Sequence, residues 1–272
     1  MSASFPPRIA LSIGGSDNSA GAGIQADLKT FSAFGIYGLT AVTCVVAEVP
    51  GKVESIQAID PAIVAAEVRL SFETFPVAAV KTGMLFSPEI IIAISEQLYR
   101  HPNVFLTVDP VMVASSGDLL IEADAVALYK ERLFPRAGLV TPNLDEVAAL
   151  VGHPICSVNA MRDAGRELTA TFKTSFLLKG GHLREPVATD LLFANGEILN
   201  FEAPYVKGMS THGTGCTYSA AITSGIARGL SLKEAVNRAK SFVTRAIAEH
   251  HRWHKGNAMT DALNISFQEG GV

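Results

Sequence analysis

The sharpest chemical signal is a glycine-rich segment, residues 210–217, which reads Ser-Thr-His-Gly-Thr-Gly-Cys-Thr and leads into a predicted helix of small residues. Glycines allow successive backbone N–H groups to point toward one place, and a helix N-terminus favours negative charge there. The pattern predicts an anion cradle that can hold a phosphoryl group. Cys216 falls in the first helical turn, where we expect a thiol pKa below its usual value of about 8.5. The plainer interpretation is a glycine turn followed by a small buried cysteine.

A second glycine cluster follows the first predicted strand. Gly14-Gly15-Ser16-Asp17 is followed by Gly21-Ala22-Gly23-Ile24-Gln25-Ala26-Asp27, whose first, third and sixth residues match a dinucleotide-binding fingerprint. Glu48 lies near the end of the next predicted strand, where such proteins place a carboxylate on a ribose. In a dinucleotide-binding protein the glycine-rich turn follows the strand directly, whereas here seven residues, 14–20, separate the predicted strand from Gly21. A dinucleotide-dependent oxidoreductase is therefore the weaker interpretation, and it leaves the later cradle unexplained.

Three further predicted strands each end beside a charged or amide side chain. Asp109 follows one buried strand, Asn143 and Glu146 follow the next, and Lys179 ends a third. Magnesium prefers oxygen ligands, so Asp109, Asn143 and Glu146 together fit a magnesium site. A cation such as Lys179 can neutralise the charge of a phosphoryl group during its transfer. Taken singly, Asp109 also fits a turn, and Asn143 with Glu146 fits a capping box at a helix start.

Three histidines near the chain end, His250, His251 and His254, fall in a stretch that we expect to be helical. Two imidazoles four positions apart would then share one helix face and could bind a metal ion. We regard such a metal site as the weaker interpretation of this segment.

The order of apolar runs along the chain indicates the fold class. Near-continuous apolar strands that alternate with helices indicate a largely parallel sheet covered on both faces, whose ligands bind beyond the carboxyl ends of the strands. The expected strands are residues 8–13, 37–47, 77–81, 104–108, 139–141, 175–179, 191–194 and 197–201, the last two joined as a hairpin by Asn195-Gly196. The expected helices are 22–34, 61–75, 88–99, one that starts at 144, 160–171, 214–228 and 231–251. No repeat or linker divides the chain, so we expect a single domain over residues 1–272, with an unassigned polar tail from residue 256.

Composition limits the class of partner. The 272 residues carry Lys+Arg 22 against Asp+Glu 26, a formal net charge of −4, and 48% of them are hydrophobic. This excludes a disordered chain, and the lack of a basic block argues against nucleic acid or an anionic membrane as the main partner. Apolar runs such as residues 90–94 are far shorter than the roughly 18 residues of a membrane span. The three cysteines form no CxxC pair, which fits the reducing cytoplasm.

Six ordered motifs resemble those of the hydroxymethylpyrimidine/phosphomethylpyrimidine kinases, the thiamine-pathway family of the ribokinase superfamily. The resemblance covers most of the chain, from about residue 9 to about residue 242, and the six motifs together are specific. They are the opening glycine signature of residues 13–30, Lys81-Thr82-Gly83-Met84-Leu85, Asp109-Pro110-Val111-Met112, Thr141-Pro142-Asn143, Lys179-Gly180-Gly181-His182 and His212-Gly213-Thr214-Gly215-Cys216.

This resemblance implies a three-layer α/β/α sandwich with a mostly parallel, ribokinase-like sheet. It further implies ATP-dependent phosphorylation of a pyrimidine hydroxymethyl group and then of the monophosphate, with ATP and Mg²⁺ as cofactors and a homodimer as the assembly. By motif, the resemblance implies a pyrimidine pocket that comprises Gly15, Asp27, Glu48, Met84 and Val111. It implies that Asp109 and Glu146 organise Mg²⁺ and phosphate beside Asn143, and that Lys179, Thr214 and Lys240 contact ATP. The anion hole would be the backbone of Gly213, Thr214, Gly215 and Cys216, with Cys216 as the base near the reacting hydroxyl.

One position departs from the family pattern. The family usually has Gln where this chain has Glu48. A Gln amide donates and accepts hydrogen bonds and can pair with an aminopyrimidine edge, whereas an ionised Glu only accepts. A ring nitrogen would then face a carboxylate unless one of the two carries a proton. A pyridoxal or pyridoxine kinase on the same scaffold stays open as the alternative, whereas Asp109, Lys179 and Cys216 argue against a mere ligand sensor.

Overall fold

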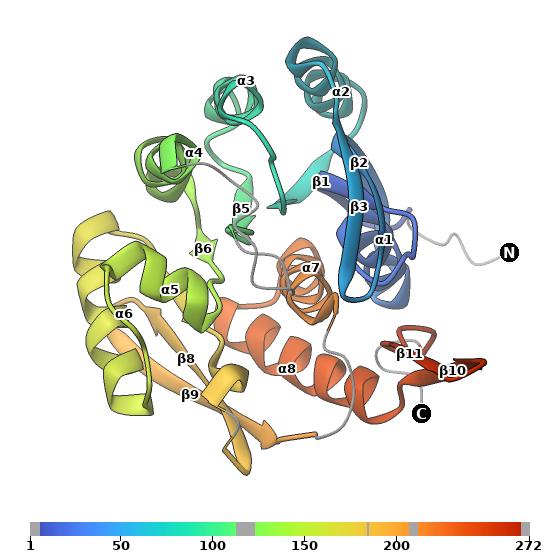
Figure 1. Ribbon diagram of the computed structural model, residues 1–272. Coiled ribbons are helices and arrows are strands. Elements are labelled where there is room, and N and C mark those ends of the chain that lie inside the picture. The colour runs from blue at the N-terminus through green and yellow to red at the C-terminus, as the bar shows by residue number, and fades with distance from the viewer. Residues whose placement is uncertain (1–5, 113–122, 184, 207–211, 268–272) are drawn as a thin grey trace, which may run out of the picture.

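Strands from both halves of the chain join in one sheet with a parallel centre (Figure 1). The computed structural model describes residues 6–112, 123–183, 185–206 and 212–267. Within these residues a nine-stranded sheet has the order β3-β2-β1-β4-β5-β6-β7-β8-β9. The neighbours β2-β1-β4-β5-β6-β7 are parallel, and β3, β8 and β9 are antiparallel at the two edges. The bounds are β1 (Ile9–Asp17), β2 (Tyr37–Val49), β3 (Lys52–Ala58), β4 (Val77–Thr82), β5 (Phe105–Val108), β6 (Leu139–Val140), β7 (Phe176–Leu178), β8 (Val187–Ala194) and β9 (Glu197–Pro204).

Helices cover both faces of this sheet, which confirms the predicted three-layer sandwich (Figure 1). One face carries α2 (Pro61–Thr74), α3 (Pro88–Tyr99), α4 (Ala123–Leu128), α5 (Leu144–Val151) and α6 (Val158–Phe172), and the other carries α1 (Gly23–Ala33), α7 (Thr214–Ala227) and α8 (Leu232–Ala248). Because side chains alternate across a strand, β7 sends Phe176 and Leu178 into the first core and Leu177 into the second. None of the described helices is long and apolar enough to cross a membrane.

Local signals set where several helices begin. Pro61 occupies the first turn of α2, and the Asp60 side chain accepts a hydrogen bond from the Ala62 N–H at 2.8 Å. Ser231 and Glu234 form a capping box at the start of α8. Since the six central strands are parallel, their carboxyl ends meet at the same edge of the sheet, and the residues after them are brought together there.

The first two strands are longer than predicted. β1 continues to Asp17, so the first glycine cluster belongs to the strand and not to the following loop. β2 continues to Val49 and turns back at Gly51, where φ is +84°, into the unpredicted strand β3. Most β3 residues are exposed, so no alternation of apolar and polar residues marks this strand in the sequence.

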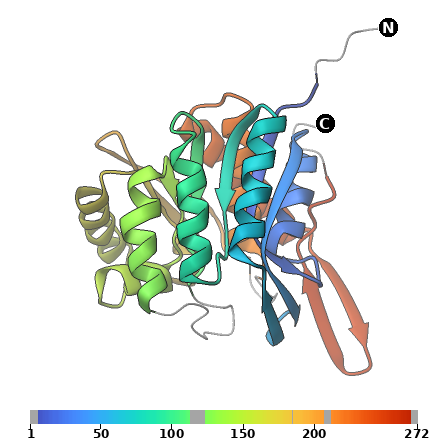
Figure 2. The same ribbon diagram turned by 90° about the horizontal axis from the view of Figure 1, so that it is seen from above.

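The C-terminal segment corrects two further predictions. α8 ends at Ala248, and β10 (His251–Lys255) and β11 (Ala258–Ala262) form a hairpin that projects from the body (Figure 2). Arg252 and Asp261 pair across it, with Nε and Oδ1 2.6 Å apart. His254 therefore lies on a strand and not one helical turn from His250. Residues beyond 256 are also not simply a polar tail, because Leu263 and Ile265 are buried in the core.

Candidate active site

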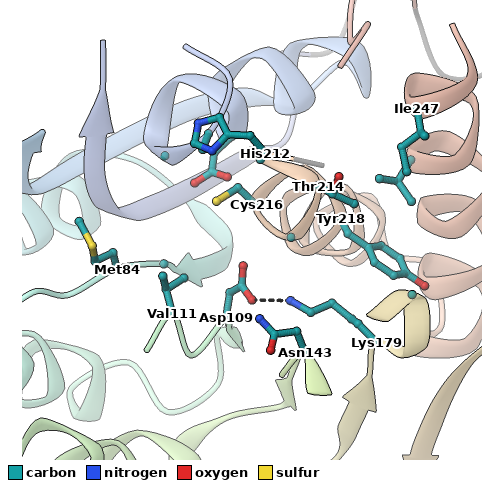
Figure 3. Close-up of a pocket in the computed structure, with 18 of the residues that line it drawn as sticks. Met84, Asp109, Val111, Asn143, Lys179, His212, Thr214, Cys216, Tyr218 and Ile247 are labelled. Carbon is teal, nitrogen blue, oxygen red and sulfur yellow. Dashed lines mark hydrogen bonds and ion pairs between the residues drawn. The ribbon is translucent and has the colours of Figure 1, made fainter. Parts of the chain in front are cut away.

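A cavity of about 810 Å³ lies at the carboxyl edge of the sheet (Figure 3). Every candidate residue from the sequence lines it, namely Gly15, Asp27, Glu48, Met84, Asp109, Val111, Asn143, Glu146, Lys179, Gly213, Thr214, Gly215, Cys216 and Lys240. These residues come from eight segments that are distant in sequence, and the parallel strands explain the meeting of most of them. Ser210 and Thr211 of the glycine motif lie outside the described residues, as does the side chain of His182. The terminal histidines do not line the cavity.

The glycines of the cradle are required by close contacts. Gly213 has a φ of +78°, and a Cβ there would collide with the backbone carbonyl of Gly21. At Gly215 a Cβ would lie 3.3 Å from Lys179 Nζ. The first intrahelical hydrogen bond of α7 runs from Thr217 N to the Gly213 carbonyl at 2.9 Å, so the preceding N–H groups have no helical partner. They are available to an anion in the cavity.

Opposite the cradle, Lys179 and Asp109 form a fixed ion pair (Figure 3). Lys179 Nζ donates to Asp109 Oδ1 at 2.9 Å, Thr141 donates to the same oxygen at 3.1 Å, and Ser219 donates to Oδ2 at 3.0 Å. Burial alone would raise the pKa of Asp109, but the charges of Lys179 and Lys81 hold it below its ordinary value. Asp109 is thus ionised and oriented, and it holds the Lys179 ammonium at the cavity wall.

Asn143 and Glu146 form the predicted capping box and also line the cavity. Asn143 Oδ1 accepts from Glu146 N at 3.0 Å, and Glu146 Oε2 accepts from Asn143 N at 2.7 Å. The capping box is therefore confirmed, and the same two residues also border the cavity. Burial, together with the nearby charge of Asp109, raises the pKa of Glu146 to about 8 against the opposing charge of Lys179.

The expected lowering of the Cys216 pKa is wrong. Burial raises the pKa of the thiol to about 11, and the charges of Asp27 and Asp109 add to this effect. The Lys81 charge and a hydrogen bond from the Gly23 N–H oppose the rise without cancelling it. The helix N-terminus is therefore outweighed by desolvation and by nearby carboxylates, and Cys216 is a neutral thiol at neutral pH.

The substrate half of the cavity is built around Gly15, whose missing side chain leaves room beside Met84. A Cβ at Gly15 would lie 3.0 Å from Met84 Cε and 2.9 Å from Cys44 Sγ. Met84 and Val111 supply apolar walls suited to a flat ring, and Glu48 supplies a half-buried carboxyl group. Burial raises the pKa of Glu48, as does its neighbour Asp17.

Sequence reasoning assigned no role to two charged groups that shape this site. Lys81 is 1% exposed and lies 2.7 Å from Asp27 Oδ2, so the Asp27 carboxylate is engaged by a buried cation behind the cavity wall. Asp190 holds Lys240, with Oδ2 and Nζ 2.7 Å apart. The available signal was the same in both cases, a charged residue inside an otherwise apolar strand, because such a residue is buried only when it is paired.

A parallel sheet with helices on both faces, an amide cradle at one helix start and a lysine facing it defines the class: this is a small-molecule kinase of ribokinase-like fold. The family model for phosphomethylpyrimidine kinase matches residues 17–261. The chain belongs to this family, as the ordered motifs predicted. The dinucleotide oxidoreductase interpretation is therefore wrong.

Individual relatives agree with the family. The chain is 44% identical over 251 residues to the hydroxymethylpyrimidine/phosphomethylpyrimidine kinase of Rhizobium meliloti, covering 91% of this chain and 93% of the relative. It is also 44% identical over 245 residues to the thiamine biosynthesis bifunctional protein ThiED of Geobacter sulfurreducens, covering 90% of this chain but only 50% of that longer protein. Among solved structures, an ADP complex of Bacillus subtilis pyridoxal kinase superposes with a TM-score of 0.86 at 32% identity, covering 95% of this chain and 98% of that one.

Proposed function

We propose that this kinase transfers the γ-phosphoryl group of ATP to the hydroxymethyl group of 4-amino-5-hydroxymethyl-2-methylpyrimidine and then to the resulting monophosphate. The observation that carries the proposal is the placement of the Gly213–Cys216 amides and Lys179 in the same cavity as Glu48, Met84 and Val111. A phosphoryl donor at the cradle and a ring between Met84 and Val111 would bring the two reactants together within one cavity.

The chain's own residues act mainly by positioning and by neutralising charge. Phosphoryl transfer passes through a loose transition state in most analyses, so the protein's largest contribution is to hold the donor and to stabilise charge on its oxygens. The amides of the cradle and the Lys179 ammonium, which lies close to Gly215, would both face that charge. Cys216 gives its amide to the cradle and its neutral thiol to the side of the attacking hydroxyl; when the thiol has released its proton to water, the thiolate accepts the proton of that hydroxyl.

The donor set fits a magnesium ion at Asp109 and Glu146. Both side chains are carboxyl groups at the cavity, and burial, with a smaller effect of the Asp109 charge, raises the pKa of Glu146. A hard divalent cation beside Glu146 would favour its ionised form, and Asn143 stands beside the two acids. When bound, Mg²⁺ would neutralise phosphate charge there. The Glu146 carboxyl group is also held by backbone donors, the Asn143 N–H on Oε2 at 2.7 Å and the Met112 N–H.

Substrate identity is tested by direct comparison of three acceptors. A pyridoxal kinase is the second candidate, because a pyridoxal kinase superposes on most of the chain with a TM-score of 0.86. An ADP-release assay coupled to a chromogenic readout would use hydroxymethylpyrimidine, its monophosphate and pyridoxal side by side. We expect turnover of both pyrimidines, with kcat/KM for pyridoxal at least about tenfold lower, a difference of about 1.4 kcal/mol. Preference for pyridoxal would assign the chain to the second candidate.

A homodimer is part of the same proposal. Three large apolar side chains on β2 and β3, Val45, Val49 and Val53, are 49%, 52% and 39% exposed, and Val49 and Val53 also border the cavity. Exposed apolar side chains of this kind are suited to contact with a second copy. Light scattering coupled to size exclusion measures the mass directly. We expect twice the chain mass for the wild type and the single-chain mass for a V45D/V49D variant.

A further inference from the structure

Asn18, in the loop after β1, makes a side-chain contact with the backbone of Glu48. Asn18 Oδ1 accepts a hydrogen bond from the Glu48 N–H at 2.7 Å, although the two residues stand 30 positions apart in the chain. Asn18 follows directly on the last residue of β1 and does not line the cavity, whereas Glu48 lies near the end of β2 and does. The contact therefore joins this loop to the strand that carries a carboxyl group of the cavity.

The end of the β1–β2 pairing shows what this hydrogen bond replaces. The parallel register of the two strands ends with Asp17 opposite Val46, two residues before Glu48. The chain then turns away from the sheet, with the Ala20 N–H donating to the Asp17 carbonyl at 3.0 Å. Because β1 does not extend to Glu48, the Asn18 side chain supplies the acceptor that the backbone of a longer β1 would supply.

On its other side Glu48 lies at an irregularity of the β2–β3 pairing. The register shifts between Ala47 and Glu48, which leaves Glu54 of β3 as an extra residue between the paired ones. A bulge of this kind bends a strand and changes the direction of its side chains. Regular pairing therefore does not continue through Glu48 on either side, and the hydrogen bond from its N–H to Asn18 restrains it there.

The Glu48 carboxyl group has charged neighbours at short distances. One of its oxygens lies within 4.8 Å of an Asp17 oxygen and of a His212 ring nitrogen, and these two residues contact each other directly. At such distances a displacement of about 1 Å changes both the direction of the carboxyl group and the charge that it experiences. A contact that holds the backbone of Glu48 therefore also sets how its carboxyl group meets a ligand.

We propose that Asn18 is a positioning residue for the acceptor substrate, whose side-chain carbonyl holds the end of β2 so that the Glu48 carboxyl group meets the polar edge of the ring. The inference rests on the proposed function in one respect, that the ring lies against Glu48. The backbone of Asn18 does not require an asparagine, because its φ is not positive, unlike that of Ala20 at +57°. The side chain is also exposed, so what the asparagine adds at this position is its acceptor oxygen.

Two variants of Asn18 test the contact, because N18A removes the acceptor and N18D keeps an oxygen at the same place. Steady-state kinetics at saturating ATP gives kcat and KM for hydroxymethylpyrimidine separately. We expect N18A to raise KM about three- to tenfold, as for the loss of one neutral hydrogen bond. Its kcat should stay within about twofold of the wild type, because the cradle and Lys179 are unchanged. We expect N18D to keep the wild-type KM within about twofold.

A double-mutant cycle with E48A shows whether Asn18 acts through Glu48. If it does, N18A/E48A should have the same KM as E48A, because no carboxyl group is left to position. N200A is the matched control, since Asn200 is also exposed and its Oδ1 accepts from Arg162 at 3.1 Å, outside the cavity. This control should leave KM for the pyrimidine within about twofold of the wild type.

An unchanged KM in N18A would overturn the inference alone. So would a raised KM in N18D, an equal rise in KM when Glu48 is already alanine, or a rise that N200A shares. Failure of the wild-type chain to phosphorylate hydroxymethylpyrimidine would overturn the proposed function and this inference with it.

Discussion

His212 Nε2 lies 3.1 Å from Asp17 Oδ2, although the two residues stand 195 positions apart in the chain. The same carboxylate accepts from Ser19 N at 2.7 Å and from Ala22 N at 2.8 Å. Burial alone would raise the pKa of Asp17, but these hydrogen bonds hold it well below its ordinary value. The hydrogen bond to Asp17 in turn raises the pKa of His212. This pair therefore holds His212, the residue that precedes the cradle, against Asp17 at the end of β1.

Stability should depend on pH through this pair. Because the folded-state pKa of His212 is raised, its contribution is fully present below the unfolded value of about 6.5 and is lost as pH rises through the folded value. We expect H212N to lower the free energy of unfolding by about 2 kcal/mol near pH 5.5, the size of a charge-assisted hydrogen bond, and by less near pH 9. Urea unfolding at both pH values measures this.

The control for this experiment is H153N, since His153 is exposed. It should leave the free energy of unfolding within about 0.5 kcal/mol of the wild type at both pH values, as surface substitutions usually do. A deficit in H212N that is the same at both pH values, or larger at the higher one, would contradict the ion pair.

Glu48 should recognise an aminopyrimidine edge in its neutral form. Burial raises the Glu48 pKa and the Asp17 charge raises it further, against the charge of His212. A protonated carboxyl group donates to a ring nitrogen and accepts from the exocyclic amine, as a Gln amide does. The wild-type kcat/KM for hydroxymethylpyrimidine should therefore fall as pH rises through that pKa, because the neutral fraction falls.

The variant E48Q cannot titrate and should lose this decline while preserving or improving turnover at neutral pH. Steady-state kinetics across the pH range compares the two proteins. If E48Q lost both pyrimidine and pyridoxal turnover, Glu48 would recognise a third substrate, and the pairing of its neutral carboxyl group with an aminopyrimidine edge would be wrong.

Replacing Cys216 by Ala should reduce kcat by about 10²–10⁴, the range for loss of a general base. Because the thiol pKa is raised to about 11, the wild-type rate should also climb toward alkaline pH, and the variant should lack that rise. Single-turnover kinetics at several pH values separates this effect from nucleotide binding, which should be unchanged. C156A is the control, because Cys156 is exposed and outside the cavity. Full turnover by C216A would remove Cys216 from the reaction.

The sequence predicted the site better than it predicted the electrostatics inside it. Asp109, Asn143 and Lys179 each follow an apolar strand, and parallel strands necessarily bring such positions to one edge. Nothing in the sequence shows that the Cys216 thiol is buried and feels the charges of Asp27 and Asp109, so the sign of its pKa shift was predicted wrongly. The effect depends on three-dimensional burial, which spacing along the chain does not report.

Two hairpins show a different limit. β3 and the β10–β11 pair bury few side chains, so neither carries the apolar periodicity on which prediction depends. The histidines of β10 were assigned to a helix because α8 precedes them directly and no proline or glycine intervenes before Gly256. Cross-strand pairing of Arg252 with Asp261 stabilises the hairpin instead, and such a contact is visible only in the structure.

Gly213 offers the most direct test of the cradle, because a second glycine provides its control. Gly213 and Gly229 have φ values of +78° and +88°, so alanine at either position introduces similar backbone strain, about 1 kcal/mol or more. At Gly229 a new Cβ meets nothing within 4 Å, whereas at Gly213 it collides with the backbone of Gly21. G213A must therefore move the cradle, and G229A need not.

We expect both variants to lower the melting temperature, but only G213A to lower kcat, by about 10²-fold or more, as for loss of an oxyanion-type donor. Differential scanning fluorimetry and the ADP-release assay measure the two effects on the same preparations. If the two variants lost equal stability and G213A kept wild-type kcat, the amides before α7 would not hold the transferring group. G229A has the backbone strain but does not displace the cradle. A difference in kcat between G213A and G229A therefore reports the displacement of the cradle and not the loss of stability.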